Sequence, residues 1–261
     1  MTGTTSKSVV ITGSTRGIGR GLAYEFLKRG HRVVLNGRKA EDLAGVLKEF
    51  RELGYTAEAV AGDVCEEGTF AGLLRKAREV YGGIDIWINN AGIPQSHLLF
   101  EELDPAEIRR LVEVNVTSTM QGTREAIRCF REQGHGLVLN MEGFGSDGRM
   151  MDKLSLYGTT KRAVNYFSRA AAREVKEPSI RVGVISPGMV RTDFLEQSSS
   201  AADPREQERN RRVFAILGED VEVVTPILVE KILHNRKHYP RIKFLTFRRL
   251  FPRILKLALK K

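Results

Sequence analysis

The stretch Thr12-Gly13-Ser14-Thr15-Arg16-Gly17-Ile18-Gly19 links a short apolar run at residues 9–12 to a helical pattern at residues 22–27. Glycines at such a junction permit a tight turn, close approach of the backbone to a pyrophosphate, and close packing of the helix on the strand. The first amide groups of the helix then point at the anion. A glycine-rich turn without a ligand is the alternative, but the position between a first strand and a first helix favours a dinucleotide site.

The rest of the chain alternates between strand-like and helical patterns. We expect strands at residues 9–12, 32–35, 57–61, 84–88, 137–140 and 181–186, and a seventh near 239–244. Helices are expected between them, the longest at residues 66–81, 105–132 and 155–176. This alternation predicts an α/β fold with a parallel sheet covered on both faces. We treat residues 1–261 as one domain.

Residues 191–224 interrupt this alternation, because they are polar and rich in Ser, Glu and Arg. Ligands of open α/β sheets bind beyond the carboxyl ends of the strands. We therefore interpret residues 191–224, which follow the sixth strand, as a substrate lid.

The net charge of +10 is concentrated at one end of the chain. Eleven basic residues and no acidic residue follow Glu230, whereas residues 1–230 hold 31 basic and 32 acidic residues. A nearly neutral body argues against nucleic-acid binding. Two distant cysteines, Cys65 and Cys129, predict neither a metal site nor a disulfide framework. Because we find no secretory signal and no membrane-spanning run, we expect a cytoplasmic protein.

The end of the second strand reads Asn36-Gly37-Arg38. An NAD site uses an acidic residue here to bind the ribose 2′-hydroxyl, and this chain has none at that point. Arg38 and Arg16 are suited to a 2′-phosphate, because guanidinium groups form paired hydrogen bonds with phosphates. We therefore expect NADP(H) rather than NAD(H); the alternative is that both arginines are merely solvated.

Tyr157 and Lys161 are four residues apart, which places them on one face of a helix. A nearby ammonium group lowers the pKa of a phenol towards the range of a general acid–base. Such pairs also occur as solvated neighbours, so this signal is weak when taken alone.

Taken together, these motifs resemble the short-chain dehydrogenase/reductase family over about residues 7–193. The glycine turn fits the pattern Thr12-Gly-x-x-x-Gly-x-Gly19 of its cofactor site. Further matches are Asp63-Val64, Asn89-Asn90-Ala91-Gly92, Asn115, Tyr157-x-x-x-Lys161, Ser186-Pro187-Gly188 and Thr192. The resemblance implies a Rossmann-type doubly wound sheet and an enzyme that transfers hydride.

The resemblance also implies a role for each matching residue. Tyr157 would exchange a proton with the substrate oxygen, and Lys161 would bind the nicotinamide ribose and lower the pKa of Tyr157. Asn115 would hold a water of the proton relay. The remaining cofactor contacts would come from Asp63, Val64, Asn90, Ala91, Gly92, Pro187, Gly188, the backbone of Val190 and the hydroxyl of Thr192.

One departure from the family concerns the fifth strand, which usually ends in a serine that orients the substrate carbonyl. Here Glu142-Gly143 stands where two serines are common. Ser146 or Ser155 could replace the serine after a loop shift, Glu142 could contact the substrate, or the contact could be lost at a cost of about 10²–10³ in rate. The sequence Asn140-Met141-Glu142-Gly143 resembles the chlorophyll b reductase branch, whose members reduce a formyl group on a large apolar ring.

The last residues, 245–261, form a basic tail. Apolar residues at 247, 250, 251, 254, 255 and 258 recur at helical spacing beside arginines and lysines, although Pro252 interrupts the pattern. A basic amphipathic helix of this kind binds a membrane surface weakly, closes the substrate cleft, or packs on a second subunit. Family members that form tetramers commonly end differently, so we expect a homodimer through the helices at 105–132 and 155–176.

The sequence therefore predicts an NADP(H)-dependent oxidoreductase that interconverts a carbonyl and an alcohol on a sizeable apolar substrate. Two alternatives stay open. The missing serine would suit an NADP(H)-binding protein with little catalysis, and the basic tail would suit a peripheral membrane module.

Overall fold

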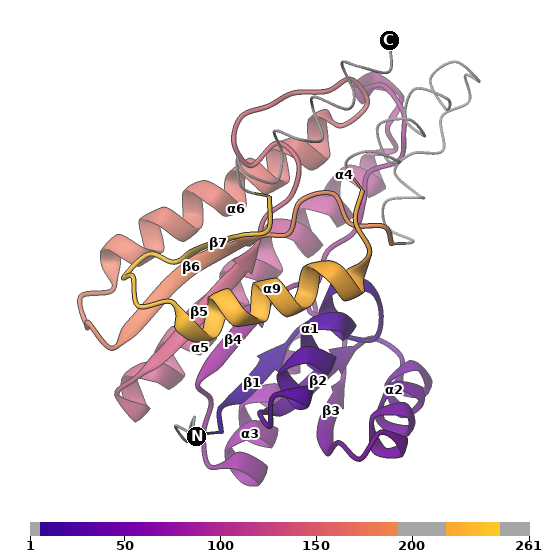
Figure 1. The fold of residues 1–261 in the computed structure, drawn as a ribbon. Helices are drawn as coiled ribbons and strands as arrows, with labels where there is room; N and C mark the ends of the chain where they lie inside the picture. The colour runs from indigo at the N-terminus through magenta and orange to yellow at the C-terminus, as the bar shows by residue number, and fades with distance from the viewer. Residues whose placement is uncertain (1–5, 193–217, 246–261) are drawn as a thin grey trace, which may run out of the picture.

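The structure, a computed structural model, describes residues 6–192 and 218–245. Seven strands form one parallel sheet in the order β3-β2-β1-β4-β5-β6-β7 (Figure 1). The strands are β1 (Ser8–Ile11), β2 (Arg32–Gly37), β3 (Ala57–Ala61), β4 (Ile86–Asn89), β5 (Gly136–Met141), β6 (Ile180–Ser186) and β7 (Arg241–Lys243). The predicted strands and the doubly wound α/β fold are confirmed.

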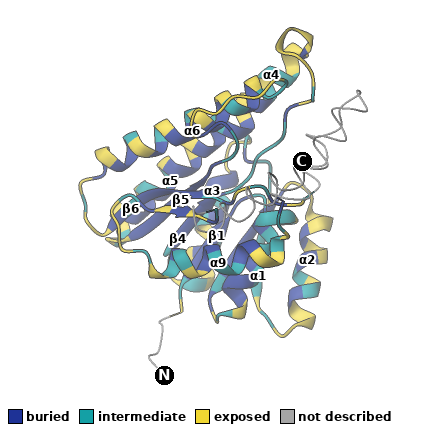
Figure 2. Ribbon diagram, turned by 45° about the horizontal axis from the view of Figure 1, so that its top comes forward, coloured by how far each residue is buried: buried dark blue, intermediate teal, exposed yellow. Residues whose placement is uncertain are grey.

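Helices cover both faces of this sheet. One face carries α1 (Gly17–Lys28), α2 (Ala40–Glu52) and α9 (Val221–His234), and the other carries α3 (Thr69–Tyr81), α5 (Ser118–Gln133) and α6 (Ser155–Glu174). Successive strand residues point to opposite faces: Val9 and Ile11 join the first core, whereas Val10 joins the second. Figure 2 shows the buried strands between helices whose outer surfaces are exposed.

The helix expected at residues 105–132 is not continuous. It consists of α4 (Pro105–Val112), a π-helical segment η2 (Glu113–Thr117) and α5, and a short 3₁₀ helix η1 (Phe100–Glu102) precedes it. Its start is as predicted, because the Asp104 carboxylate accepts a hydrogen bond from the Ala106 N–H at 2.6 Å. Single π-helical turns within α-helices are frequent at functional sites.

Helix α9 is the element that the sequence patterning does not predict. Its first turns are rich in β-branched valines, and Pro226 lies inside it without an N–H to donate. Burial outweighs these preferences, because Leu228 and Val229 lie in the core that α9 shares with α1 and the sheet. The helix begins at Val221, so the last four residues of the range 191–224 belong to α9 rather than to a lid.

The two ends of the segment between β6 and α9 are joined to each other. Val190 and Glu219 form an isolated parallel bridge. The Arg191 N–H donates to the Glu219 carbonyl at 2.8 Å, and the Glu219 N–H donates to the Met189 carbonyl at 3.0 Å. The rest of the predicted lid, residues 193–217, lies outside the described residues, as does the predicted tail beyond Leu245.

Three further findings concern membrane-spanning helices, metal sites and disulfides. Within the described ranges, no helix is long and apolar enough to cross a membrane. The same ranges contain no cluster of His, Cys, Asp and Glu suited to a metal ion. Cys65 and Cys129 are both free thiols.

Candidate active site

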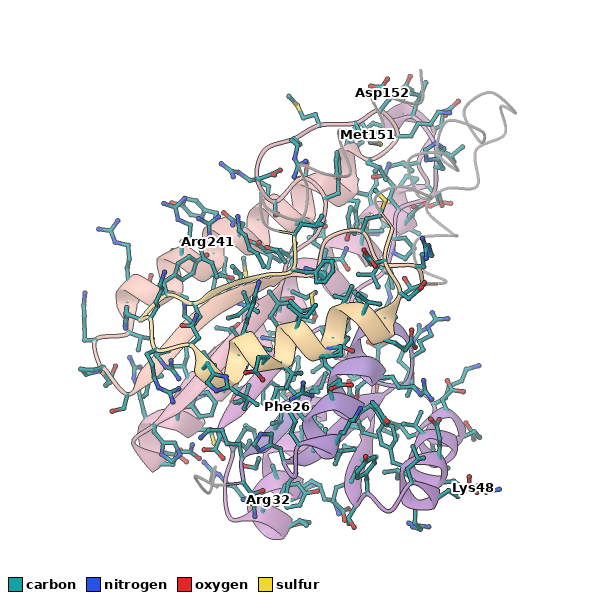
Figure 3. All side chains as sticks on the ribbon, viewed as in Figure 1. Phe26, Arg32, Lys48, Met151, Asp152 and Arg241 are labelled. Carbon is teal, nitrogen blue, oxygen red and sulfur yellow. The ribbon has the colours of Figure 1, made fainter. Side chains whose placement is uncertain are left out.

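A cleft of about 2060 Å³ opens at the carboxyl ends of the strands. It runs from the glycine turn after β1, past the ends of β4 and β5, to β7. In Figure 3, Met151 and Asp152 mark its border on the loop before α6, and Arg241 marks its border on β7. The strand order reverses between β1 and β4, which is where ligands of such sheets bind.

The glycine turn is closely packed against the loop after β4. Gly13 has a φ of +61°, and a Cβ at this position would lie 2.8 Å from the Ala91 Cα. A Cβ on Gly19 would collide with the Gly13 carbonyl oxygen. The Asn90 amide donates to the Thr12 and Gly13 carbonyls, each at 2.9 Å. Side chains are therefore excluded where a backbone must approach a pyrophosphate, so the turn fits a dinucleotide cofactor.

Asn36 and Arg38, at the end of β2, have different surroundings. The Asn36 amide donates to the carbonyls of Val60 at 3.2 Å and Gly62 at 3.0 Å, so this residue joins β2 to the end of β3. Arg38 is exposed and lines the cleft, and so does Arg16. No carboxylate among the described residues pairs with Arg38. The two predicted 2′-phosphate ligands thus lie on the rim of one cleft.

Asp63 and Val64 line the cleft as well, beyond the end of β3. The Asp63 carboxylate accepts hydrogen bonds from Arg110 of α4 at 2.5 Å and from the Cys65 N–H at 3.0 Å. Burial opposes ionisation of Asp63, but these two donors hold its pKa below the ordinary value. The predicted adenine side of the cleft therefore holds an ion pair between Asp63 and Arg110.

Tyr157 and Lys161 lie on the inner face of α6, and both are buried where they line the cleft. The Lys161 Nζ lies 5.6 Å from the centre of the Tyr157 ring and donates to the Met141 carbonyl at 3.3 Å. Burial raises the pKa of Tyr157. Burial also lowers the pKa of Lys161 to about 8, against the opposing effect of the Glu142 charge. The pair is therefore buried rather than solvated, and the pKa of Tyr157 lies above its ordinary value because of burial, not below it as the sequence predicts.

Asn115 belongs to η2 and is buried. Its amide oxygen accepts from the Ile93 N–H at 2.9 Å, and its amide nitrogen donates to the Ile93 carbonyl at 3.0 Å and to the Thr160 hydroxyl at 3.3 Å. Asn115 thus fastens the loop after β4 to α6 at Thr160, the residue directly before Lys161.

Glu142 directly follows β5, and it lines the cleft although it is almost fully buried. Its carboxylate accepts hydrogen bonds from the Asn165 amide and the Ser186 hydroxyl. Neither of these partners is predicted from the sequence, because they come from α6 and β6 and meet Glu142 only in the fold. Both carboxylate oxygens thus accept hydrogen bonds from the protein, Oε1 from Asn165 and Oε2 from Ser186, so Glu142 does not repeat the role of the usual serine.

Gly143 and Ser146 occupy the turn that follows. A Cβ on Gly143 would collide with the Tyr157 hydroxyl, which lies directly over this glycine. The Ser146 N–H donates to the Gly143 carbonyl at 3.2 Å, and Ser146 lines the cleft. Ser155 is exposed at the first turn of α6 and does not line the cleft. Of the two serines considered as replacements, the structure brings Ser146 to the site.

The loop after β6 closes the side of the cleft opposite to α6. Pro187, Gly188, Val190 and Thr192 all line it. A Cβ on Gly17 would lie 3.3 Å from the Thr192 Cγ2, so this loop lies against the glycine turn. The predicted cofactor residues from the ends of β1, β2, β3, β4 and β6 therefore surround one continuous space, with the exception of Ser14. Ser14 is fully buried and does not line the cleft, and its hydroxyl donates to the Ile11 carbonyl at 2.9 Å.

A doubly wound sheet with a phosphate-binding glycine turn and a buried Tyr–Lys pair defines a nucleotide-dependent oxidoreductase. The comparison with known families agrees: the description "short chain dehydrogenase" matches residues 7–203. The chain belongs to the short-chain dehydrogenase family.

Among its relatives, the chain is 33% identical over 92% of its length to "Probable chlorophyll(ide) b reductase NYC1, chloroplastic" of Oryza sativa subsp. japonica, of which it covers 50%. It is 35% identical over 95% of its length to "Chlorophyll(ide) b reductase NOL, chloroplastic" of the same plant, of which it covers 75%. These matches confirm the resemblance to the chlorophyll b reductase branch. The chain spans about half the length of the NYC1 relatives.

Other relatives act on smaller molecules. The chain is 31% identical over 73% of its length to a 3alpha-hydroxysteroid dehydrogenase of Mediterraneibacter gnavus, of which it covers 76%. Among solved structures, levodione reductase gives a TM-score of 0.80 at 25% identity, with 91% of this chain and 94% of that chain covered. The fold and the oxidoreductase class are thus shared with proteins that differ in substrate.

Proposed function

We propose that this protein is an NADP(H)-dependent oxidoreductase that interconverts a carbonyl and an alcohol on a sizeable apolar substrate. The observation that carries the proposal is the buried Tyr157–Lys161 pair, which lines the same cleft as the glycine turn. The identity to reductases of large ring substrates supports the reaction class and the size of the substrate.

The bound cofactor supplies or accepts the hydride. In the direction of reduction, the Tyr157 hydroxyl donates its proton to the substrate oxygen, because burial keeps the phenol protonated. Lys161 places a positive charge near Tyr157, which stabilises the phenolate left behind. The backbone N–H groups of Gly17 and Gly19, at the start of α1, would hold the pyrophosphate, whereas the Gly13 N–H donates to the Asn36 Oδ1 at 3.4 Å. Asn115 holds the loop that faces Lys161.

The test is turnover of a panel of aromatic aldehydes, steroid ketones and a formyl-bearing tetrapyrrole with NADPH and with NADH. We expect NADPH-dependent turnover of at least one compound, and we expect Tyr157→Phe to abolish it without changing the Kd of NADPH. Absence of turnover across the panel, with NADPH bound normally, would favour the second candidate.

The preference for NADPH rests on Arg38 and Arg16 at the rim of the cleft. Arg38→Ala is expected to raise the Kd of NADPH by about tenfold or more, since a charge-assisted hydrogen bond to phosphate contributes about 1.5–3 kcal/mol. The Kd of NADH should stay nearly unchanged. Fluorescence titration of the nicotinamide measures both constants, and equal constants in the unmodified protein would contradict the assignment.

The second candidate is an NADP(H)-binding protein with little catalysis. It is favoured by one observation, namely that glycine stands where the family has its carbonyl-orienting serine.

We also propose a homodimer through α5 and α6, on which Met120 and Tyr166 are exposed apolar residues. Sedimentation of Tyr166→Glu beside the unmodified protein tests this assembly.

A further inference from the structure

The position of Tyr157 explains why the usual serine is absent. Its hydroxyl lies where a side chain on Gly143 would begin. A serine at residue 143 and the observed Tyr157 therefore exclude each other. If the proposed carbonyl chemistry takes place here, the hydrogen bond that orients the substrate oxygen has to come from another residue.

Gln95, in the loop after β4, has a fixed side chain beside the catalytic tyrosine. It is 1% exposed and lines the cleft. Its Oε1 accepts a hydrogen bond from the Tyr157 N–H at 2.9 Å. Because a backbone N–H requires an acceptor, this bond defines which end of the amide is oxygen and which is nitrogen. The Gln95 Nε2 is therefore a donor held at a known place.

No acceptor among the described residues receives a hydrogen bond from the Gln95 Nε2, although the atom is buried. A buried amide donor without an acceptor costs about 1–3 kcal/mol. Such groups are rare in folded proteins and frequently mark places where a ligand binds. Since Gln95 lines the cleft, a ligand in the cleft can supply the acceptor.

Several amide and hydroxyl donors of the site have partners within the protein, whereas the Tyr239 hydroxyl, which lines the same cleft, has none among the described residues. The Asn165 amide and the Ser186 hydroxyl donate to Glu142. The Asn115 amide donates to Ile93 and Thr160, and the Asn90 amide donates to the glycine turn. Ser146 is the remaining hydroxyl that sequence reasoning singles out, and its alanine variant tests the competing assignment.

We propose that the Gln95 Nε2 donates a hydrogen bond to the substrate carbonyl oxygen and takes over the role of the usual serine. This inference rests on the proposed function. No proton leaves Gln95: Tyr157 supplies the proton, while Gln95 orients the oxygen and stabilises the charge that develops on it. The preferred substrate is then a carbonyl compound whose oxygen reaches both Tyr157 and the loop after β4.

Gln95→Glu is the decisive variant. A glutamate keeps an oxygen for the Tyr157 N–H, but its ionised carboxylate offers an acceptor where the substrate needs a donor. We expect kcat to fall by about 10²–10³, with the Kd of NADPH unchanged. Lowering the pH should restore part of kcat, because a protonated carboxyl group donates a hydrogen bond. A merely structural role would not produce this recovery.

Gln95→Met and Ser146→Ala complete the set. Gln95→Met has a similar length and removes both hydrogen bonds, so it should lower kcat at every pH without recovery in acid. Ser155→Ala, at an exposed residue that does not line the cleft, is the control and should keep kcat within about twofold of the unmodified enzyme, whereas Ser146→Ala tests the competing serine. All variants are assayed with NADPH and the panel compound that the unmodified enzyme reduces fastest, and thermal melting identifies any variant that fails to fold.

The outcomes separate this inference from the proposed function. If the unmodified protein turns over no compound of the panel, the proposed function fails. If it is active and Gln95→Glu retains its kcat, or if Ser146→Ala causes the loss instead, Gln95 is not the donor. If both Gln95 variants lower only the melting temperature, Gln95 is a helix cap for α6 and the inference is overturned.

Discussion

Gly143 shows how one residue can look like a defect in a sequence and prove to be a requirement of the structure. Comparison with the family favours restoring a serine at this position. The Tyr157 hydroxyl lies against the glycine, so any side chain displaces the catalytic oxygen. The family comparison therefore predicts that Gly143→Ser raises kcat, whereas the structure predicts that the same variant lowers kcat.

We predict that Gly143→Ser lowers kcat by about tenfold or more, because a displacement of about 1 Å in a reacting group can reduce the rate by about 10²-fold. The Kd of NADPH should change little. Steady-state kinetics with NADPH measures the effect. Gly92→Ala is an unsuitable control because a Cβ there would lie 3.2 Å from the Asn115 Oδ1. Gly148→Ser lacks close neighbours and serves as the control for the loop, although its φ of +93° adds strain. A Gly143→Ser enzyme faster than the unmodified one would contradict the geometry.

Glu142 affects the charge of Lys161. Burial disfavours the ammonium and lowers the pKa of Lys161 to about 8, while the nearby carboxylate favours the ammonium. The charged form of Lys161 is therefore present below about pH 8 and is lost as the pH rises through that value. Removing the carboxylate charge should lower the pKa of Lys161 further.

We predict that Glu142→Gln moves the alkaline decline of kcat to lower pH, since less of Lys161 is then charged at any given pH. The shift should be measurable in a plot of log kcat against pH. Glu142→Asp, which keeps the charge, should return the decline towards its original pH even if kcat is lower. An unchanged pH profile in Glu142→Gln would show that Glu142 only packs against Asn165 and Ser186.

At the scale of elements, the strands are predictable and the last helix is not. Strands β1, β4 and β5 are short, mainly apolar runs whose side chains are buried on both faces, and this composition is visible in the sequence, whereas the edge strands β3 and β7 are partly exposed. The patterning of α9 instead contains valines and Pro226, and only its burial against α1 makes it helical. The site divides in the same way. Its glycine turn and Tyr–Lys pair are local motifs, whereas Gln95, Asn165 and Ser186 acquire their roles through contacts between distant segments.

Two glycines provide a matched test of how a strand and a helix tolerate an added methyl group. Gly136 begins β5 beneath the Phe130 ring, so a methyl group there would collide with the ring. Gly72 lies inside α3, where a Cβ would make an ordinary contact of 3.5 Å with Val60. We predict that Gly136→Ala destabilises the fold by about 1–3 kcal/mol. Gly72→Ala should stabilise it by about 0.5–1 kcal/mol, because alanine is the better helix former.

Urea denaturation measures both free energies of unfolding. Neither residue lines the cleft, so kcat should not change in either variant. Equal changes in stability for the two substitutions would mean that the Phe130 ring moves aside without cost.

At the scale of the whole molecule, charge separates the body from its end. Eleven basic residues follow Glu230, and some of them belong to the tail, whose residues 246–261 lie outside the described residues. We predict weak, salt-sensitive binding to anionic vesicles, since each basic residue near such a surface contributes roughly 1 kcal/mol. Co-sedimentation with anionic and neutral vesicles at low and high salt measures this. Equal recovery in the supernatant under all four conditions, with dimerisation lost when residues 247–261 are removed, would assign the tail to internal packing.

The bridge between Val190 and Glu219 has a consequence for how such an enzyme can change its substrate. The segment whose two ends this bridge joins can be exchanged as a unit, or cassette, because its replacement leaves the anchoring backbone hydrogen bonds in place. The entropy of closing a loop grows only slowly with its length, so cassettes of different size cost the fold little. We predict that grafting the corresponding stretch of a relative in place of residues 193–217 changes which substrates react, while Thr192 and the hydride chemistry are retained. Variation of this scaffold can thus be confined to the segment between these anchors, while the sheet and its covering helices stay unchanged.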